Sequence, residues 1–220
     1  MNKSTKSRLT EKQLAVFPGN TLFERIARAV CRAGTLPGKE LFEAWEVARR
    51  VRRLFRGGRV VDLACGHGLL AHIMLILDDT SPCALAVDTD IPKNAPDLSN
   101  TLIDTWPRLR GRIEYRTADL ASVTARPDDL VLSVHACGTL TDLVLEKAMA
   151  AGAAVAVLPC CHDTGRSDTG ALTGWMDGPL AVDAVRALKM QQLGYAVTTA
   201  TIPADITPKN RLLMGHRAML

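Results

Sequence analysis

Five side chains that can act as bases, nucleophiles or soft metal ligands follow two short apolar runs: His135, Cys137, Cys160, Cys161 and His162. Three interpretations of this group are open. The first is catalysis, with His135 as the first choice of general base, His162 as the second, and the cysteines as reactive or substrate-positioning groups. The second is a zinc site made of Cys137, Cys160, Cys161 and His162, although their spacing differs from the C-x-x-C pattern of structural zinc sites. The third is packing, because free cysteines behave as small hydrophobic residues.

A second group of residues surrounds a small-residue turn. The apolar run Val60–Ala64 leads into Cys65-Gly66-His67-Gly68 and then into a helical pattern. Backbone N–H groups at such a strand–turn–helix junction come close to a bound ligand. Asp88 ends the next apolar run, 22 residues after Gly66, where a carboxylate can accept both hydroxyl protons of a ribose. The pattern predicts a nucleotide-type cofactor.

Both groups need a parallel sheet to bring them together, and the alternation of patterns after Arg59 predicts one. Strands are expected at Val60–Ala64, Ala84–Asp88, Ile113–Arg116, Leu130–Val134, Ala153–Leu158, Ala196–Ile202 and Leu212–His216. Helices are expected at Leu69–Leu77, Asn100–Trp106, Leu140–Ala151 and Leu180–Leu193. Aromatic residues make up only 4% of the chain, which also favours a sheet packed with Ala, Val, Leu and Ile. The predicted fold class is therefore α/β, with a Rossmann-like, seven-stranded, mostly parallel sheet.

The last two predicted strands break the alternation. About ten residues separate them, including Pro203 and Pro208, and this segment is too short for a crossover helix. We therefore expect these strands to form an antiparallel hairpin at the edge of the sheet. Ligands of such open sheets bind beyond the carboxyl ends of the strands, so the His and Cys group should converge there.

The N-terminal part of the chain differs from the rest in both pattern and charge. Apolar residues at helical spacing predict one helix over Thr21–Arg32 and another over Lys39–Phe55, so we divide the chain into a basic helical segment, 1–58, and a main domain, 59–220. Residues 1–59 carry 14 Lys and Arg against 5 Asp and Glu, or +9, and the remainder carries −5. A basic segment of this kind fits an RNA partner as well as it fits a solvated helix face. The predicted RNA-contacting residues are Arg49, Arg50, Arg52, Arg53 and Arg56.

Composition excludes two other classes of protein. The longest apolar runs fall well short of the roughly 18 residues needed to cross a bilayer, and no apolar segment follows the basic N-terminus as in a secretory signal. We therefore expect a cytoplasmic protein with no membrane partner. Its six cysteines are too few for a disulfide scaffold, so reduced thiols are expected.

The type of cofactor depends on one carboxylate. Gly66, Gly68 and Ala71 satisfy G-x-G-x-x-A, which keeps a nicotinamide- or flavin-dependent dehydrogenase as an alternative. Asp62, however, lies late in the first predicted strand, where a carboxylate would repel a pyrophosphate. A cationic ligand suits Asp62 better.

Asp62, the turn and the terminal hairpin together resemble the class I S-adenosylmethionine-dependent methyltransferases, over about residues 40–220. In that family an acidic residue near the end of the first strand precedes a G-x-G-x-G turn, and Ala64 here replaces the first glycine. The resemblance implies that Asp62 lies near the amino-acid end of the cofactor and Asp88 on its ribose. It also implies cofactor contacts for Ala64, Cys65, Gly66, His67 and Gly68, and adenine contacts for Asp119 and Leu120. As an alternative, Asp119 caps a turn or helix.

The motifs His135-Ala136-Cys137-Gly138 and Pro159-Cys160-Cys161-His162 resemble one branch of that family more closely. This branch contains methyltransferase-like proteins and the CHHC-type tRNA ribose 2′-O-methyltransferases, whose accessory zinc fingers are lacking here. The resemblance implies an enzyme that uses S-adenosylmethionine and methylates RNA, with tRNA as one candidate. Alternatives are a small-molecule or protein methyltransferase and a catalytically silent, cofactor-binding adaptor.

Overall fold

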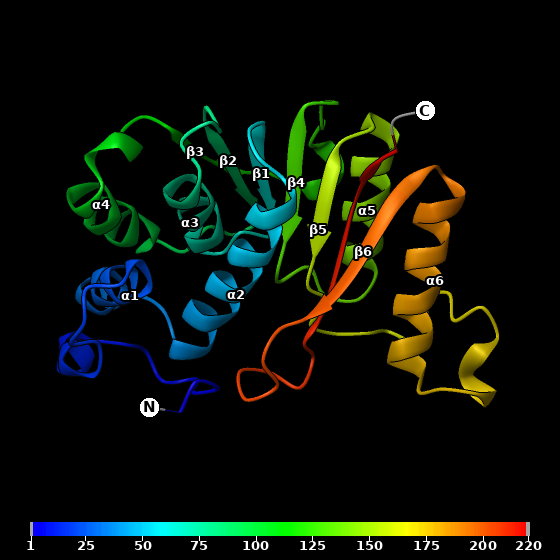
Figure 1. Ribbon diagram of the computed structural model, residues 1–220, viewed down its shortest axis with the longest axis horizontal. Helices are drawn as coiled ribbons and strands as arrows, with labels where there is room; N and C mark the ends of the chain where they lie inside the picture. The colour runs from blue at the N-terminus through cyan, green and yellow to red at the C-terminus, as the bar shows by residue number, and fades with distance from the viewer. Residues whose placement is uncertain (1, 219–220) are drawn as a thin grey trace.

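The computed structural model describes residues 2–218, and every structural statement below concerns that range. Seven strands form one sheet in the order β3-β2-β1-β4-β5-β7-β6 (Figure 1). The strands are β1 (Arg59–Leu63), β2 (Ala84–Asp88), β3 (Ile113–Thr117), β4 (Asp129–Ser133), β5 (Ala154–Val157), β6 (Tyr195–Thr201) and β7 (Arg211–Arg217). The α-helices are α1 (Leu22–Ala33), α2 (Gly38–Leu54), α3 (Leu69–Leu77), α4 (Ala95–Thr105), α5 (Thr139–Ala151) and α6 (Gly178–Gln192). Short 3-10 helices are η1 (Glu11–Val16), η2 (Pro107–Leu109), η3 (Leu120–Ser122) and η4 (Leu172–Gly174).

The sheet has the predicted topology. Strands β1 to β5 pair in parallel, with Val60 in register with Ala84 on one side and Leu130 on the other. Strand β7 lies between β5 and β6 and is antiparallel to both. The predicted doubly wound sheet with a C-terminal antiparallel hairpin is confirmed.

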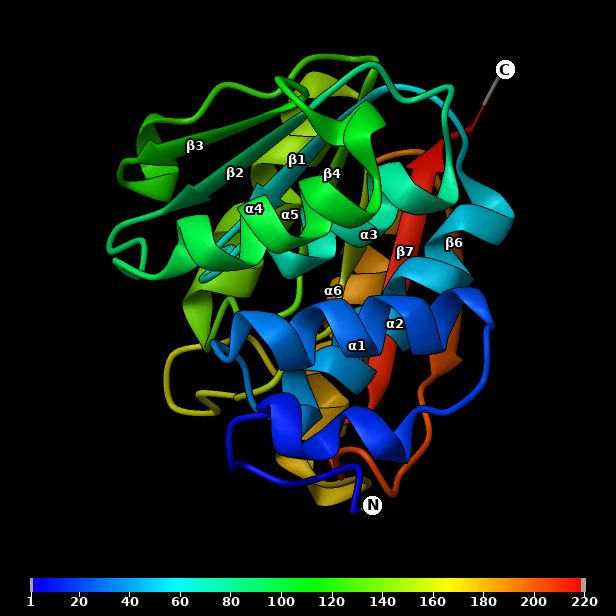
Figure 2. The ribbon, with the colours of Figure 1, turned by 90° about the vertical axis from the view of Figure 1, so that its left-hand side faces the viewer.

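Helices cover both faces of the sheet and form two separate cores. Residues of α1, α2, α3 and α4 pack with Val60, Ala86 and Leu132 on one face, which is turned toward the viewer in Figure 2. Residues of α5 and α6 pack with Val61 and Val131 on the opposite face. Within residues 2–218, no helix has both the length and the apolar character that spanning a membrane requires.

Each predicted helix and strand begins and ends within two residues of the observed one, except that α4 begins earlier than predicted. This helix was expected at Asn100–Trp106, but it begins five residues earlier, at Ala95. Pro96 lies in its first turn, where the missing N–H of proline costs no intrahelical hydrogen bond. Leu98 and Leu102 follow at helical spacing and are fully buried.

The N-terminal segment packs on the main body. The Leu9 N–H donates to the Leu36 carbonyl oxygen at 2.8 Å, and both side chains are buried. The core on this face runs from Leu9 to Met214 without a break at residue 58. The division into 1–58 and 59–220 remains a prediction, and its outermost positions, 1, 219 and 220, lie outside the described residues.

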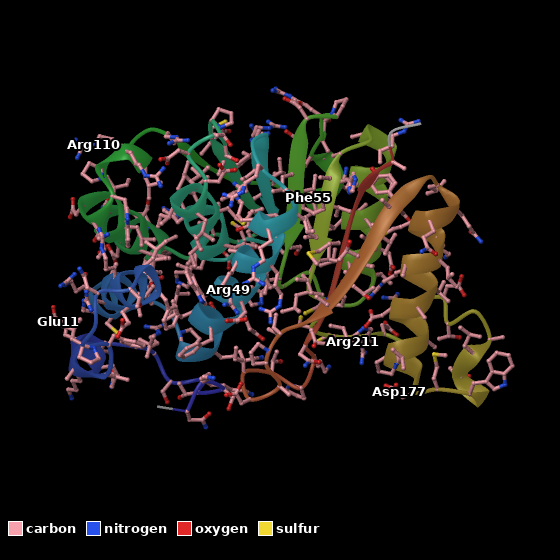
Figure 3. The ribbon with its side chains drawn as sticks, viewed as in Figure 1. Glu11, Arg49, Phe55, Arg110, Asp177 and Arg211 are labelled. Atoms are coloured by element: carbon pink, nitrogen blue, oxygen red, sulfur yellow. The ribbon has the colours of Figure 1, made fainter. Side chains whose placement is uncertain are left out.

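The basic residues at the end of α2 are mostly engaged within the protein (Figure 3 labels Arg49 and Phe55 at this end). Arg52 is buried, and its guanidinium lies 3.0 Å from the Asp78 carboxylate. The inclusion of Arg52 in an RNA-contacting set is therefore wrong, because the side chain faces the core. Arg49 and Arg50 both pair with Glu46. Two further members of the predicted set are exposed, namely Arg56, which donates to the Leu77 carbonyl, and Arg53.

Candidate active site

The turn between β1 and α3 is held by neighbouring strands. The Gly66 N–H donates to the Asp88 carboxylate at 2.9 Å, and the Tyr115 hydroxyl donates to the His67 carbonyl oxygen at 2.8 Å. Gly66 adopts a φ of +52°, and a Cβ added there would have no neighbour within 4 Å. Gly68 also has a positive φ, but a Cβ there would strike the Tyr115 ring. Asp88 and Tyr115 therefore hold the turn in place, while the side of Gly66 on which a Cβ would lie remains open.

Ala64 occupies a backbone conformation that normally favours glycine. Its φ is +58°, in the left-handed region, at the position where the methyltransferase motif carries its first glycine. An L-residue in this region costs about 1–2 kcal/mol. Ala64 thus adopts the left-handed conformation that suits a glycine, and its backbone is strained there.

Asp62 is a buried carboxylate without a cationic partner among residues 2–218. It accepts a hydrogen bond from the Ala71 N–H at 3.2 Å. Burial, together with the negative charge of Asp88, raises the pKa of Asp62 to about 7. A cationic group bound beside Asp62 would stabilise its ionised form.

A narrow cavity of about 20 Å³ lies over this carboxylate. Its wall on the sheet side includes Asp62, Ala64, Cys65, His67 and His135. Its opposite wall comes from the N-terminal segment, through Leu36, Glu40 and Ala44. Sequence reasoning assigned no role to these three residues.

His135 lines the cavity and is also exposed to solvent. Its surroundings lower its pKa through desolvation, and the positive charge of Lys39 lowers it further. His135 is therefore neutral at pH 7 and able to accept a proton.

The predicted adenine-contacting pair lies at the start of η3. Asp119 accepts a hydrogen bond from the Ala121 N–H at 2.8 Å and caps this 3-10 helix, as the alternative interpretation stated. Leu120 is buried in the core on the α5 face. An adenine contact for these two residues remains a prediction.

The loops after β4 and β5 meet as the topology requires. The Gly138 N–H donates to the Cys161 carbonyl oxygen at 3.0 Å. The Sγ atoms of Cys137, Cys160 and Cys161 all lie within 4.8 Å of one another. The His162 imidazole lies outside this group, because its Nε2 is 2.7 Å from the Asp183 carboxylate. The structure thus brings together three of the four predicted metal ligands.

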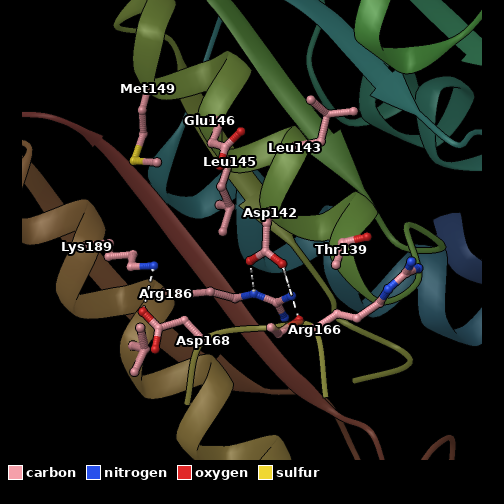
Figure 4. A pocket seen from close by; sticks show the side chains of 12 residues that line it. Thr139, Asp142, Leu143, Leu145, Glu146, Met149, Arg166, Asp168, Arg186 and Lys189 are labelled. Atoms are coloured by element: carbon pink, nitrogen blue, oxygen red, sulfur yellow. Dashed lines mark hydrogen bonds and ion pairs between the residues drawn. The ribbon is translucent and has the colours of Figure 1, made fainter. Parts of the chain in front are cut away.

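A larger cavity, of about 420 Å³, lies between α5 and α6 on the other face of the sheet (Figure 4). Four of its charged residues are paired with one another. Arg186 binds the Asp142 carboxylate, and Lys189 lies 3.0 Å from that of Asp168. Glu146 and Arg166 also line this cavity, and neither forms an ion pair within residues 2–218.

Comparison with known proteins gives one family and many similar folds. The model of a family described as a methyltransferase domain matches residues 45–166, more than half of the chain. An O-methyltransferase family protein from Burkholderia thailandensis superposes with a TM-score of 0.53 at 19% identity, covering 96% of this chain and 63% of its own. A putative RNA methyltransferase from Pyrococcus horikoshii gives 0.50 at 18% identity, covering 83% and 85%. Magnesium protoporphyrin IX methyltransferase from Synechocystis, solved with bound SAH, gives 0.53 at 13% identity, covering 94% and 93%.

These identities are low, so the superpositions establish a shared fold alone. The chain spans less than two thirds of the Burkholderia protein's length. No curated protein sequence matches it.

Proposed function

Because this chain belongs to the methyltransferase-domain family, we propose that it uses S-adenosylmethionine to methylate RNA, with tRNA as one candidate. Residues at the ends of β1 and β2 and in the turn between β1 and α3 fit that cofactor. Asp62 offers a buried carboxylate to a cationic ligand, Gly66 leaves open space over the turn, and Asp88 stands at the end of β2. Bound S-adenosylmethionine supplies an electrophilic methyl group.

The observation that supports an RNA acceptor is the positive charge of Arg8, Lys39 and Lys209 near the candidate site residues. Burial lowers the pKa of His67, and the charge of Arg8 lowers it further. Lys39 acts in the same way on His135, and Lys209 opposes the burial that raises the pKa of Cys137. Arg8 and Lys209 are exposed. Arg8 and Lys209 are thus exposed cations that can neutralise phosphates, whereas Lys39 on α2 pairs with Glu43 at 3.4 Å.

His135 is the residue that we propose as the general base. Methyl transfer is an in-line displacement, so the protein must align the acceptor and shield the reaction from water. A ribose hydroxyl starts protonated and loses its proton as the new bond forms. Neutral His135, on the wall of the cavity, can take that proton on a ring nitrogen.

The experiment begins with binding and then follows the methyl group. Calorimetric titration of the full chain with S-adenosylmethionine and with NAD separates a methyltransferase from a dehydrogenase. The chain is then incubated with cofactor labelled in the methyl group and with tRNA, total RNA, protein extract or small metabolites. We expect label in RNA, located by mass spectrometry of nucleosides. Label only in protein or small molecules, or binding without transfer, contradicts the proposal.

Matched variants test the acceptor surface. Arg8→Ala and Lys209→Ala should raise the KM for RNA and together reduce the salt slope of RNA binding by about 1 to 2. Lys189→Ala, an exposed lysine on α6, is the control and should change neither. Equal effects of all three variants would remove the support for an RNA-binding edge.

A further inference from the structure

Three thiols from two separate loops form a compact group at the edge of the sheet. Cys137 follows β4, whereas Cys160 and Cys161 follow β5. All three Sγ atoms lie within 4.8 Å of one another, and those of Cys137 and Cys160 are 2.9 Å apart. We call this group the thiol cluster.

Packing does not explain the thiol cluster. Cys137 and Cys161 are exposed, and Cys160 is half-buried. By contrast, Cys31 lies fully in the apolar core of the α1 face, as a structural cysteine does. A hydrophobic role therefore accounts for Cys31 but not for three solvent-accessible sulfurs.

The backbone around the thiol cluster is fixed by a chain of contacts. The Gly138 N–H binds the Cys161 carbonyl oxygen, and the Gly138 carbonyl oxygen accepts from the Arg186 guanidinium at 3.0 Å. Arg186 in turn donates twice to the Asp142 carboxylate, at 2.7 and 2.9 Å. The two cysteine-bearing loops are thereby anchored to α5 and α6, which preorganises the sulfurs.

We propose that Cys137, Cys160 and Cys161 bind one zinc-type divalent cation through three thiolates, and that its fourth coordination position is open. Zinc–sulfur bonds of about 2.3 Å in a tetrahedral site separate the sulfurs by about 3.8 Å. The Sγ atoms of Cys137 and Cys160 are closer than that, at 2.9 Å, and every pair lies within 4.8 Å, so binding requires side-chain rotations that move Cys137 and Cys160 apart. Each thiol releases its proton to solvent as its sulfur binds the cation, and no electron is transferred.

The open position follows from the ligand count. Within residues 2–218 no His, Asp or Glu joins these three cysteines in a common ligand group. His162 is adjacent in sequence, but its Nε2 is held by Asp183. Structural zinc sites are closed by four protein ligands, whereas catalytic sites keep one position for water or substrate. Cys137 lies two residues after His135, so one member of the thiol cluster and the proposed general base belong to the same loop after β4.

Cobalt provides a direct probe of this site, independent of methyl transfer. The full chain, reduced and freed of metal with a chelator, is titrated with Co²⁺. We expect one equivalent to produce sulfur-to-cobalt charge-transfer bands and tetrahedral d–d bands, and Zn²⁺ to displace it. Zinc should also protect three of the six thiols from a thiol-counting reagent.

Variants separate the thiol cluster from other cysteines. Cys137→Ser, Cys160→Ser and Cys161→Ser should each abolish the charge-transfer bands at stoichiometric cobalt, with far-UV circular dichroism confirming the fold. Cys83→Ser, which changes a half-buried thiol outside the cluster, should keep them. Failure of the reduced wild-type chain to bind one equivalent overturns the proposal, and so does equal loss in Cys83→Ser.

A second measurement tests the open position. An added small thiol should shift the d–d bands of the cobalt-loaded chain, because it can occupy the fourth site. Bands that do not move contradict an open position. Loss of methyltransferase activity plays no part in either readout, so failure of the RNA proposal leaves this one to be judged on its own.

Discussion

The carboxylate of Asp88 accepts the backbone N–H of Gly66 at 2.9 Å and so joins the end of β2 to the turn after β1. This contact positions the turn before any ligand binds. The same carboxylate is the predicted partner of the cofactor's ribose, so its removal should affect both the turn and the ligand.

Replacing Asp88 should weaken cofactor binding. A hydrogen bond to a charged group contributes about 1.5–3 kcal/mol, so Asp88→Ala should raise the Kd for S-adenosylmethionine roughly 10- to 100-fold in calorimetry. Asp90→Ala is the control, because Asp90 is exposed and offers only its backbone N–H to Asp88. A similar loss in both variants would show that Asp88 has no specific role.

Asp62 should make both stability and cofactor binding depend on pH. Burial raises its pKa from an ordinary 3.8 to about 7 in the folded, ligand-free chain. Its contribution to stability is therefore fully present below pH 4 and is lost as pH rises through about 7. Thermal unfolding of the wild type should show this loss relative to Asp62→Asn.

Cofactor affinity should change in the opposite direction. A cationic ligand binds best to ionised Asp62, so the affinity for S-adenosylmethionine should rise as pH increases through about 7. Asp62→Asn should flatten that dependence in calorimetric titrations. An unchanged pH profile in the variant would assign the titration to another group.

Replacing Ala64 with glycine should destabilise the protein less than replacing Ala86 with glycine. Ala64→Gly relieves a positive φ worth about 1–2 kcal/mol and adds about 0.5–1 kcal/mol of backbone entropy cost. Its free energy of unfolding should stay equal or rise by up to about 1.5 kcal/mol. Ala86→Gly, in the buried centre of β2, should lower it by about 1–2 kcal/mol. Denaturant unfolding measures both, and an equal loss would contradict the strain at Ala64.

Neighbouring arginines on α2 should behave differently. Arg52→Ala removes one partner of a buried ion pair with Asp78 and should lower the free energy of unfolding by about 3–5 kcal/mol. Arg53→Ala, at an exposed position, should stay within about 0.5 kcal/mol of the wild type. Urea unfolding distinguishes them, and a stable Arg52→Ala would contradict the structural role.

His135 should affect turnover rather than cofactor binding. Loss of a general base costs about 100- to 10,000-fold, so His135→Ala should lower kcat to that extent with an unchanged Kd for S-adenosylmethionine. Added imidazole should restore part of the rate. His216→Gln changes an exposed histidine on β7 and serves as the control. Full turnover of His135→Ala at saturating acceptor would end the base assignment.

The fold could be predicted because its signals are local. Apolar strands alternate with helical patterns, and the short segment after Ile202 permits only a hairpin. The convergence of Cys137 with Cys160 and Cys161 followed from topology, since parallel strands end at one edge. These predictions needed no knowledge of long-range contacts.

The remaining features depend on partners distant in the chain. Arg52 is separated by 26 residues from the carboxylate that holds it in the core, and nothing near it in sequence indicates Asp78. His162 likewise shares a motif with the cysteines, but Asp183 on α6 holds its imidazole elsewhere. The wall formed by Leu36 and Glu40 depends on how the N-terminal segment docks.

The position of β7 in the sheet also has a consequence for folding. Within residues 2–218, strand β6 pairs with β7 alone, and β7 also completes the hydrogen bonding of β5. Any state in which residues 211–217 have not docked therefore leaves β5 with an open edge and β6 without a partner. Open strand edges invite pairing with other chains. We therefore expect docking of β7 to be the folding step most exposed to misassembly.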